Sequence, residues 1–266
     1  MKEIALQITR ETEEQKLNIL REYLQSYVLF LMQKVGMSES LYFIGGTALR
    51  FLYRIRRYSE DLDFSAGDDW IPENLKRFVK KLSAQLERAG YLCAFNVKEE
   101  RAVQKIMIGF VGLLYEAGLT NHREQKLTIN LEIDLNPPAG WSGQKTIVDI
   151  HMPVVLQHYD LPSLYAGKLH AFLMRSYTKG RDVFDLFWYR TKQKDLIPNL
   201  KLLNNAIQQT HHGFAEVSAE NWLHIVGNKV KELRWDSVRK DIVPFLEYDD
   251  DLLVFTKENL MMLFPS

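Results

Sequence analysis

The 266-residue chain contains a single cysteine, Cys93, and no surplus of charge of either sign. One cysteine excludes an internal disulfide and a metal site built from several thiolates, and it suits a reducing compartment. The 34 lysine and arginine residues balance the 34 aspartate and glutamate residues. No global positive field therefore attracts the chain to nucleic acid or to an anionic membrane, and any such contact is expected to be local.

The sequence also lacks a long apolar run. The longest extends from Ile106 to Tyr115 and is interrupted by Gly109 and Gly112, whereas a membrane-spanning helix needs about 20 apolar residues. The N-terminal residues lack the apolar core and the cleavage site of a signal peptide. We therefore expect a cytoplasmic protein with no membrane partner.

Hydrophobic residues make up 46% of the chain and charged residues 26%, which excludes disorder of the chain as a whole. Apolar steps of three and four residues predict helices over 12–35 and 72–89, and the alternation in Leu127 to Leu135 predicts the clearest strand. Further strands are predicted at 41–44, 59–65, 91–98, 103–115, 146–151 and 154–156, and further helices at 162–175, from about 181, and at 196–210, 218–233 and 249–264. The change from a mixed to a helical pattern predicts an α/β domain over 1–157 and a helical domain over 158–266.

Two adjacent glycines, Gly45 and Gly46, follow the short predicted strand at 41–44, and Thr47 is predicted to cap the next helix. Glycines let a backbone approach a phosphate, and a helix N-terminus offers free N–H donors. The strand that follows carries Asp61 and Asp63 on one face. Two neighbouring carboxylates repel each other unless they are protonated or bridged by a cation, and hard oxygen ligands suit Mg²⁺. This segment therefore favours a combined metal and phosphate site.

A two-metal nucleotidyl transfer needs a third carboxylate nearby. Glu132 and Asp134 share the polar face of the strand at 127–135, and either completes the cluster if this strand lies beside the one that carries Asp61 and Asp63. The sequence does not choose between them. The same face is also compatible with simple solvation, as one side of an antiparallel sheet often is.

The segments GGTALR at 45–50 and RYSEDLDF at 57–64 resemble those of the polymerase-β-type nucleotidyltransferases of the AbiEii/AbiGii toxin family. Three further segments agree with that family in the expected order, namely NLEIDLNPP at 130–138, LYAGKLHA at 164–171 and RDVFDL at 181–186. The resemblance implies an α/β (α+β) fold in which a mixed sheet is flanked by helices and a helical C-terminal half closes a cleft.

The resemblance also implies roles for single residues. Asp61 and Asp63 would hold the metals, with Glu132 or Asp134 as the third ligand. Gly45, Gly46, Thr47 and Ser59 would lie against the triphosphate, Lys168 would contact a phosphate, Arg57 and Arg181 would bind the leaving pyrophosphate, and Asp182 would act as a base or orient the attacking hydroxyl.

The implied reaction is Mg²⁺-dependent, with Mn²⁺ as the alternative ion, and transfers a nucleoside monophosphate from an NTP to a hydroxyl. The implied acceptor is RNA rather than DNA, at the 3′ end of a tRNA. The protein would then be the toxin of a toxin–antitoxin or abortive-infection phage-defence pair, with a cognate antitoxin. Two alternatives stay open: transfer to a small molecule or a protein hydroxyl, and a nucleotide-binding module without catalysis. The presence of Asp61, Asp63, Lys168 and Asp182 speaks against the second alternative.

Four arginines, Arg50, Arg54, Arg56 and Arg57, lie within eight residues with no acidic residue among them. Such a stretch is either a solvated helix end or a patch that meets a triphosphate or an RNA backbone. The sequence favours neither interpretation.

Overall fold

The computed structural model describes residues 12–211 and 213–265, and the chain divides into two compact units. Of the described residues, unit 1 contains those from Thr12 to Leu52 together with Tyr58–Asn136 and Lys145–His158. Unit 2 contains Tyr53–Arg57, Pro137–Gln144 and the described residues from Tyr159 onward. The domain boundary expected near residue 157 does not account for Tyr53–Arg57 and Pro137–Gln144, which precede it in the chain but belong to unit 2.

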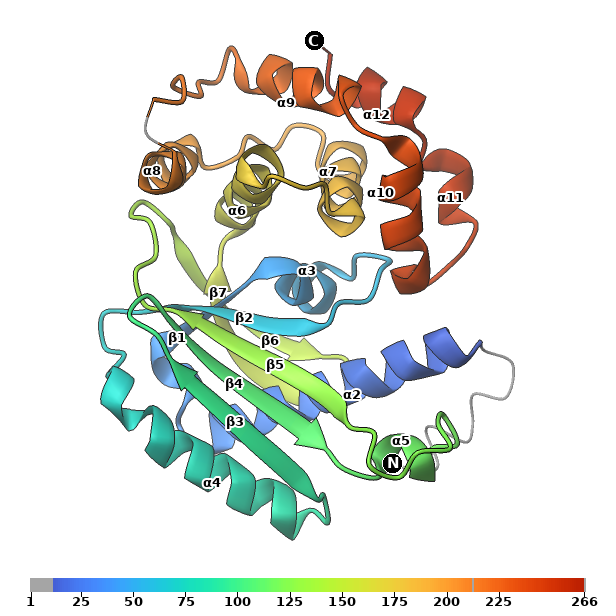
Figure 1. Ribbon diagram of the computed structural model, residues 1–266. Helices are drawn as coiled ribbons and strands as arrows, with labels where there is room; N and C mark the ends of the chain where they lie inside the picture. The colour runs from blue at the N-terminus through green and yellow to red at the C-terminus, as the bar shows by residue number, and fades with distance from the viewer. Residues whose placement is uncertain (1–11, 212, 266) are drawn as a thin grey trace. The chain divides into compact units, whose positions relative to one another are not determined.

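Within the described residues, seven strands form one mixed sheet in the order β3-β4-β5-β2-β1-β7-β6 (Figure 1). The strands belong to unit 1 except for Gly143 and Gln144 at the start of β6 and Tyr159 at the end of β7. The strands are β1 (Leu41–Ile44), β2 (Asp61–Ala66), β3 (Cys93–Glu99), β4 (Val103–Phe110), β5 (Leu127–Asp134), β6 (Gly143–Asp149) and β7 (Pro153–Tyr159). Strand β2 pairs antiparallel with β1 and parallel with β5. The α/β fold class predicted from the sequence is confirmed.

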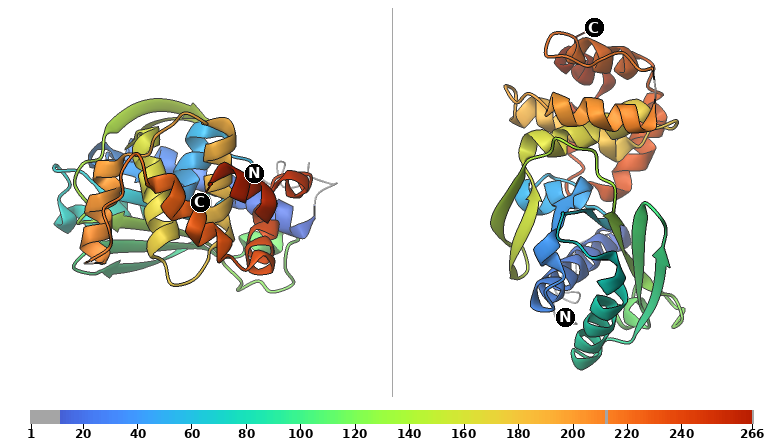
Figure 2. Two further views of the ribbon diagram at one scale, coloured as in Figure 1. Left: turned by 90° about the horizontal axis from the view of Figure 1, so that it is seen from above. Right: turned by 90° about the vertical axis from the view of Figure 1, so that its left-hand side faces the viewer.

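The helices of unit 1 are α2 (Glu13–Lys34), α3 (Gly45–Tyr53, whose last residue belongs to unit 2), α4 (Leu75–Arg88) and α5 (Leu113–Glu116), with 3₁₀ turns at Ser38–Ser40 and Pro72–Asn74. Helix α2 begins after Thr12 because the Thr12 and Gln15 side chains each accept a hydrogen bond from the other residue's backbone N–H. Helix α2 packs against β5 and helix α4 against β3. Figures 1 and 2 show both helices on the same side of the sheet.

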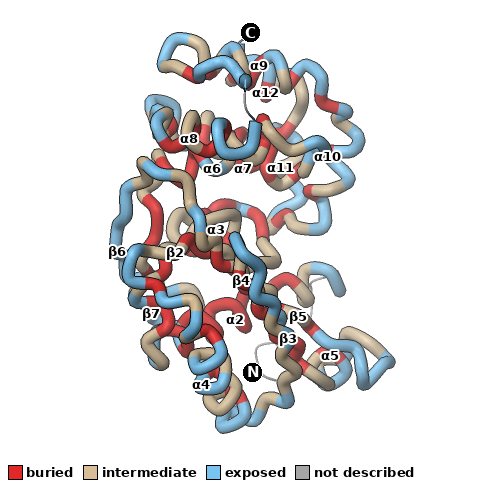
Figure 3. Tube along the Cα trace, turned by 60° about the vertical axis from the view of Figure 1, so that its left-hand side comes forward, coloured by how far each residue is buried: buried red, intermediate tan, exposed pale blue. Residues whose placement is uncertain are grey.

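Strand β5 explains how the core of unit 1 is separated from its polar face. Its odd-numbered residues from Leu127 to Ile133 are fully or almost fully buried, and the residues between them are half-buried. Because side chains of a strand alternate between faces, the apolar set packs into the core while Asn130, Glu132 and Asp134 share the other face. The buried segments are red in Figure 3.

The helices of unit 2 are α6 (Leu161–Met174), α7 (Gly180–Lys192), α8 (Leu200–Thr210), α9 (Trp222–Lys231), α10 (Trp235–Ile242), α11 (Asp251–Val254) and α12 (Lys257–Leu263), with a 3₁₀ turn at Val243–Phe245. Helix α6 packs against both α7 and α8, and α7 also packs against α10. A Cβ atom at Gly180 would collide with the Val238 carbonyl of α10, so the first residue of α7 has no room for a side chain. The missing side chain lets the start of α7 pack closely against α10.

Two local predictions in unit 1 are wrong. Thr47 does not cap a helix, because α3 already begins at Gly45 and the Thr47 hydroxyl lies inside it, donating to the Asp61 carbonyl. The strand predicted over 103–115 ends at Phe110, because Gly112 adopts a φ of +74° and the short helix α5 follows. The helix α3 therefore begins at the glycine pair rather than after it, and Gly112 turns the chain before the apolar run at 106–115 ends.

Two predictions in the C-terminal part also need correction. Helix α10 was not predicted, although Val238 and Ile242 give it a buried side with helical spacing; it is short and otherwise polar. The helix predicted over 249–264 is two helices, α11 and α12. They separate because Thr256 is extended and its hydroxyl accepts a hydrogen bond from the Asn259 N–H, which starts α12.

Candidate active site

The polar face of β2 and β5 brings the predicted carboxylates onto neighbouring strands. Asp61 and Asp63 are half-buried on one face of β2, while Leu62 and Phe64 between and after them are buried on the other. In the parallel register, Asp63 is opposite Glu132, and Ser65 is opposite Asp134. The condition that the sequence left open, adjacency of these two strands, is therefore met, and Glu132 is the nearer candidate because it is the register partner of Asp63.

The two candidate third carboxylates have different partners. Glu132 is half-buried and pairs with the Lys105 ammonium of β4 at 3.1 Å, and this hydrogen bond raises the pKa of Lys105. Asp134 lies at the end of β5, where burial raises its pKa and its carboxylate accepts a hydrogen bond from the Asn136 backbone at 2.9 Å. Asp134 thus caps the turn that follows the strand.

The glycine pair lies directly against the carboxylate strand. Ile44, the last residue of β1, is opposite Asp63 in the antiparallel register, so Gly45 follows at the level of that carboxylate. Gly45 has a φ of +79°, and a Cβ atom there would collide with the Asp63 carboxylate. The position therefore needs glycine for two reasons, its backbone conformation and its contact with Asp63.

Side-chain hydrogen bonds hold the residues that lead into β2 and its first residue. The Gln25 amide of α2 donates to the backbone carbonyls of Ser59 at 3.1 Å and Glu60 at 2.9 Å. The Asn130 amide donates to the Asp61 carboxylate at 2.9 Å. Gln25 was missed from the sequence, because a glutamine in an amphipathic helix carries no signal for a partner 34 residues away.

A metal site with all its ligands in place is absent from the part of the chain that the structure describes: no group of three His, Cys, Asp or Glu residues there is arranged to hold an ion. The donor set nevertheless fits a hard divalent ion, because Asp61 and Asp63 supply carboxylate oxygens from one strand face. Mg²⁺ is commonly held by one or two carboxylates together with waters and substrate phosphates.

A second cluster of predicted residues lies in unit 2, between α6 and α7. The Lys168 ammonium contacts the Asp182 carboxylate at 3.0 Å and the Asp185 carboxylate at 2.7 Å. Arg175 forms a further ion pair with Asp182. Arg57 donates two hydrogen bonds to Asp185, at 2.7 and 2.5 Å.

Burial and charge together set the pKa values in this cluster. Burial alone would raise the pKa of Asp182, but the Lys168 and Arg175 charges outweigh it and lower that pKa to about 2. Burial alone would lower the pKa of Lys168, but the Asp185 and Asp182 carboxylates outweigh it and raise that pKa. Both groups therefore stay charged across the physiological range.

The two arginines predicted to bind pyrophosphate have internal contacts. The Arg57 side chain is only 1% exposed and is held by Asp185 in a two-bond pair. The Arg181 guanidinium lies 3.9 Å from the centre of the Phe245 ring, and its backbone N–H donates to Asp241 at 3.2 Å. Contact of either arginine with pyrophosphate stays a prediction.

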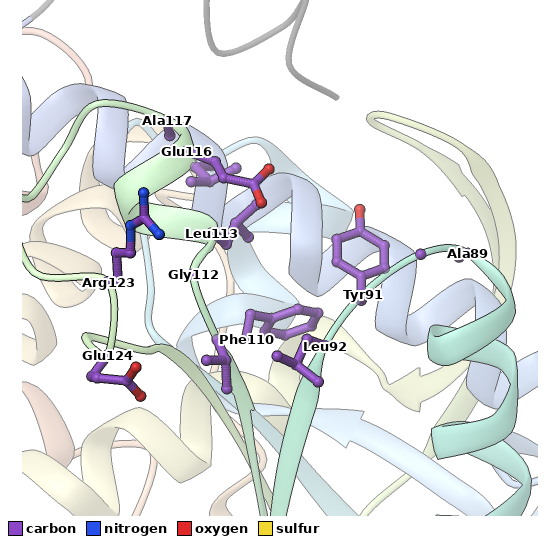
Figure 4. A pocket seen from close by; sticks show the side chains of 13 residues that line it. Ala89, Tyr91, Leu92, Phe110, Gly112, Leu113, Glu116, Ala117, Arg123 and Glu124 are labelled. Carbon is purple, nitrogen blue, oxygen red and sulfur yellow. The ribbon is translucent and has the colours of Figure 1, made fainter.

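Unit 1 also contains a cavity of about 400 Å³ beside the start of β3 and the end of β4. Figure 4 shows Tyr91 and Phe110 in its wall, with Glu116 and Arg123 near α5. None of the residues predicted to carry the chemistry lines this cavity. It is therefore separate from the carboxylate face of β2 and β5.

No helix within residues 12–211 and 213–265 is both long and apolar enough to cross a bilayer.

Comparison with known proteins gives a family match and similar solved structures. A family model described as the nucleotidyl transferase AbiEii toxin of a type IV toxin–antitoxin system matches residues 28–254. The crystal structure of JHP933 from Helicobacter pylori has a TM-score of 0.53 and 17% identity, covering 93% of this chain and 88% of that one. A second H. pylori structure, described as a nucleotidyltransferase, has a TM-score of 0.51 and 18% identity, covering 89% of this chain and 90% of that one. A search of the curated proteins found no match.

Proposed function

Because the chain belongs to the AbiEii nucleotidyl transferase toxin family of type IV toxin–antitoxin systems, and is therefore a nucleotidyltransferase, we propose that it transfers a nucleoside monophosphate from an NTP to a hydroxyl of RNA. Membership implies an antitoxin partner and an NTP substrate. The acceptor that we propose is the 3′ end of a tRNA in the cytoplasm, with Mg²⁺ as the ion and Mn²⁺ as its substitute.

The observation that carries this proposal is the shared face of Asp61, Asp63 and Glu132. Asp61 and Asp63 would hold the ion, with Glu132 as the third carboxylate because it is the register partner of Asp63. When bound, Mg²⁺ neutralises the phosphate charge and orients the triphosphate. Gly45 would give the triphosphate access to the backbone beside Asp63. Gly46 and Ser59 would lie against the triphosphate as well, whereas Thr47 is fully buried and its hydroxyl holds the Asp61 carbonyl, so its side chain would act by fixing β2.

In the proposed reaction, the acceptor hydroxyl oxygen forms a bond to the α-phosphorus of the NTP. The bond from that phosphorus to the bridging oxygen breaks, and pyrophosphate leaves with the electron pair. The hydroxyl proton passes to solvent or to a neighbouring base. By the family resemblance Lys168 would supply positive charge to a phosphate, and Arg57 holds the Asp185 carboxylate that Lys168 contacts.

Asp182 fits a positioning role better than that of a base. A general base works best when its pKa is close to the working pH, and the pKa of Asp182 is lowered to about 2. Its carboxylate contacts Lys168 and Arg175. We therefore assign Asp182 to orienting these two cations.

A transfer assay with the purified chain tests the proposal. The chain is incubated with each labelled NTP and Mg²⁺, and the acceptor is tRNA, bulk RNA, small metabolites or protein. We expect label on tRNA, loss of transfer with EDTA, and a loss of at least about 1,000-fold in Asp61→Asn and Asp63→Asn, since each removes a proposed metal ligand. Asp68→Asn is the matched control, because Asp68 is exposed and lies just beyond the same strand.

Transfer that survives in Asp61→Asn would contradict the assignment of the carboxylates. Label on metabolites or protein, with none on RNA, would instead support the alternative acceptors. Expression gives a second readout, because a toxin should arrest growth and Asp63→Ala should relieve the arrest. Normal growth with the wild-type chain well expressed would reject the toxin role.

A further inference from the structure

The four-arginine stretch separates into two kinds of side chain in the structure. Arg50 is buried in an ion pair with Glu22, and Arg57 is buried against Asp185. Arg54 and Arg56 are exposed. Two of the four positive charges are therefore used in buried ion pairs, and the other two lie on the surface of unit 2.

Arg54 and Arg56 line a cavity of about 600 Å³ in unit 2. Its wall includes three half-buried aromatic side chains, those of Tyr53, Phe187 and Trp188. It also includes a third exposed cation, Lys192. This volume lies within the range of about 300–1,000 Å³ that is usual for ligand pockets. The cavity thus combines flat apolar walls with a cationic rim.

This cavity lies on the opposite side of α7 from the Lys168 cluster. Asp182 and Asp185 are three residues apart and share one face of the helix, whereas Phe184, Phe187 and Thr191 follow one another on the opposite face. These last three line the cavity. The two groups of residues are therefore separate sites on one helix.

The charge of the cavity favours an anion. Asp251 is the acidic residue in its wall, and it forms an ion pair with Arg56 at 2.9 Å. Three cations against one carboxylate give the wall itself a net charge of about +2, which suits phosphate groups. Glu247 and Asp250, outside the wall, lie close enough to raise the pKa of Asp251, so the positive charge is confined to the wall. The exposed Val254 adds apolar surface at the same rim.

The backbone of Arg54 gives a second, independent indication. Among the described residues it is the single non-glycine residue with a positive φ, at 55°. A side chain in this left-handed region is strained, and such residues concentrate at ligand sites where the surrounding fold holds them in place. Here the strained residue is also one of the exposed cations of the cavity.

We propose that this cavity of unit 2 is a second binding site, which holds an unpaired nucleotide of the RNA acceptor by stacking its base on Trp188 and placing its phosphates against Arg54, Arg56 and Lys192. This inference rests on the proposed function for the identity of the acceptor. Aromatic stacking with a cationic rim is the usual way in which single-stranded nucleic acid is bound. A paired base cannot enter, because its faces are covered by its neighbours in the duplex.

Fluorescence anisotropy with a labelled single-stranded RNA decamer tests the site. We expect the double variant Arg54→Gln/Lys192→Gln to bind at least 10-fold more weakly than wild type and Trp188→Ala at least 5-fold more weakly. The charge-matched control is Arg239→Gln/Lys240→Gln, two exposed cations of α10 outside the cavity, which should bind within 2-fold of wild type. Far-UV circular dichroism checks that each variant is folded.

Equal weakening in the cavity variant and the α10 control would overturn the site, as would displacement of RNA by an acidic peptide at a lower concentration than by unlabelled RNA. A photo-crosslinking decamer that contains 4-thiouridine should attach to the cavity wall, and attachment elsewhere alone would also overturn it. This crosslinking result decides the question if Trp188→Ala fails to fold.

Transfer assays separate this inference from the proposed function. If RNA is labelled and Arg54→Gln/Lys192→Gln raises KM for RNA without changing KM for NTP, both are supported. If RNA is labelled and the variant has the wild-type KM for RNA, the second site is wrong and the proposed function stands. If no RNA is labelled while the decamer still binds the cavity, the site stands and the RNA acceptor is wrong.

Discussion

Buried charged residues of unit 2 are kept ionised by a few charged neighbours. Asp182 is buried and lies between the ammonium of Lys168 and the guanidinium of Arg175. Asp185 is buried between Lys168 and Arg57. Removing one member of such a cluster leaves an unbalanced buried charge, which costs more than the pair contributes. These residues therefore act as a group, although the sequence shows them as separate motifs.

The first residue-scale prediction concerns acid unfolding. The folded pKa of Asp182 is lowered from 3.8 to about 2, so its ionised form stabilises the protein above about pH 4, and this contribution is lost as the pH falls toward 2. We expect Asp182→Asn to lower the free energy of unfolding by about 2 kcal/mol at pH 7 and by much less near pH 2. Urea unfolding at pH 7, 4, 3 and 2 measures this.

Asp236→Asn, at an exposed aspartate of α10, controls for the loss of a surface charge and should follow the wild type at each pH. A constant difference between wild type and Asp182→Asn from pH 7 to pH 2 would show that the side chain stabilises the fold through packing rather than through its charge.

At the scale of elements, strand alternation was predictable and pairing was not. The pattern of residues 127–135 places the carboxylates of β5 on one face without any knowledge of the fold, because the side-chain period of a strand is two. The register that pairs Asp63 with Glu132 comes from the packing of the whole sheet. The Thr47 hydroxyl likewise donates to the Asp61 carbonyl instead of capping α3, and this contact joins two elements that the local pattern does not connect.

Gly45→Ala tests the contact between α3 and β2. Gly118→Ala is the matched control, because Gly118 also has a positive φ, at 70°, but open space around it. The control should cost about 1 kcal/mol of unfolding free energy from backbone strain. Gly45→Ala should cost about 1–3 kcal/mol more, because the new Cβ displaces Asp63.

We also expect nucleotide transfer by Gly45→Ala to fall about 100-fold, since a small displacement of a positioned group has an effect of that size. Thermal unfolding and initial rates measure the two effects. Wild-type transfer in Gly45→Ala would mean that the position of Asp63 beside the glycine pair is not needed for the reaction.

For the whole molecule, the net charge of zero is a sum over buried ion pairs and separate exposed clusters of each sign. Some cations are neutralised inside the fold, as Arg50 is by Glu22 and Arg57 by Asp185. Acidic residues gather on the polar face of β2 and β5, while exposed cations line the cavity of unit 2. A neutral chain with local sites of both signs needs no overall positive field to meet RNA.

The salt dependence of RNA binding follows from this distribution. With three cations of the cavity at phosphates, the logarithm of the association constant should fall against the logarithm of salt concentration with a slope of about −2. In Arg54→Gln/Lys192→Gln the slope should shrink to about −0.7, because one phosphate contact remains. Anisotropy titrations between 50 and 300 mM KCl measure it. An unchanged slope in the variant would place the phosphate contacts outside the cavity.

The sequence by itself determined the fold class, most of the elements and the family, because hydrophobic periods and ordered motifs are local properties of the chain. It placed Asp61 with Asp63 on one strand face, and it predicted roles for Lys168 and Asp182, which the structure brings into contact. Only the tertiary structure decided that Glu132 lies beside Asp63 and that Arg57 is enclosed by Asp185. It also divided the four-arginine stretch into buried and exposed pairs, because burial depends on which distant segments pack around each side chain.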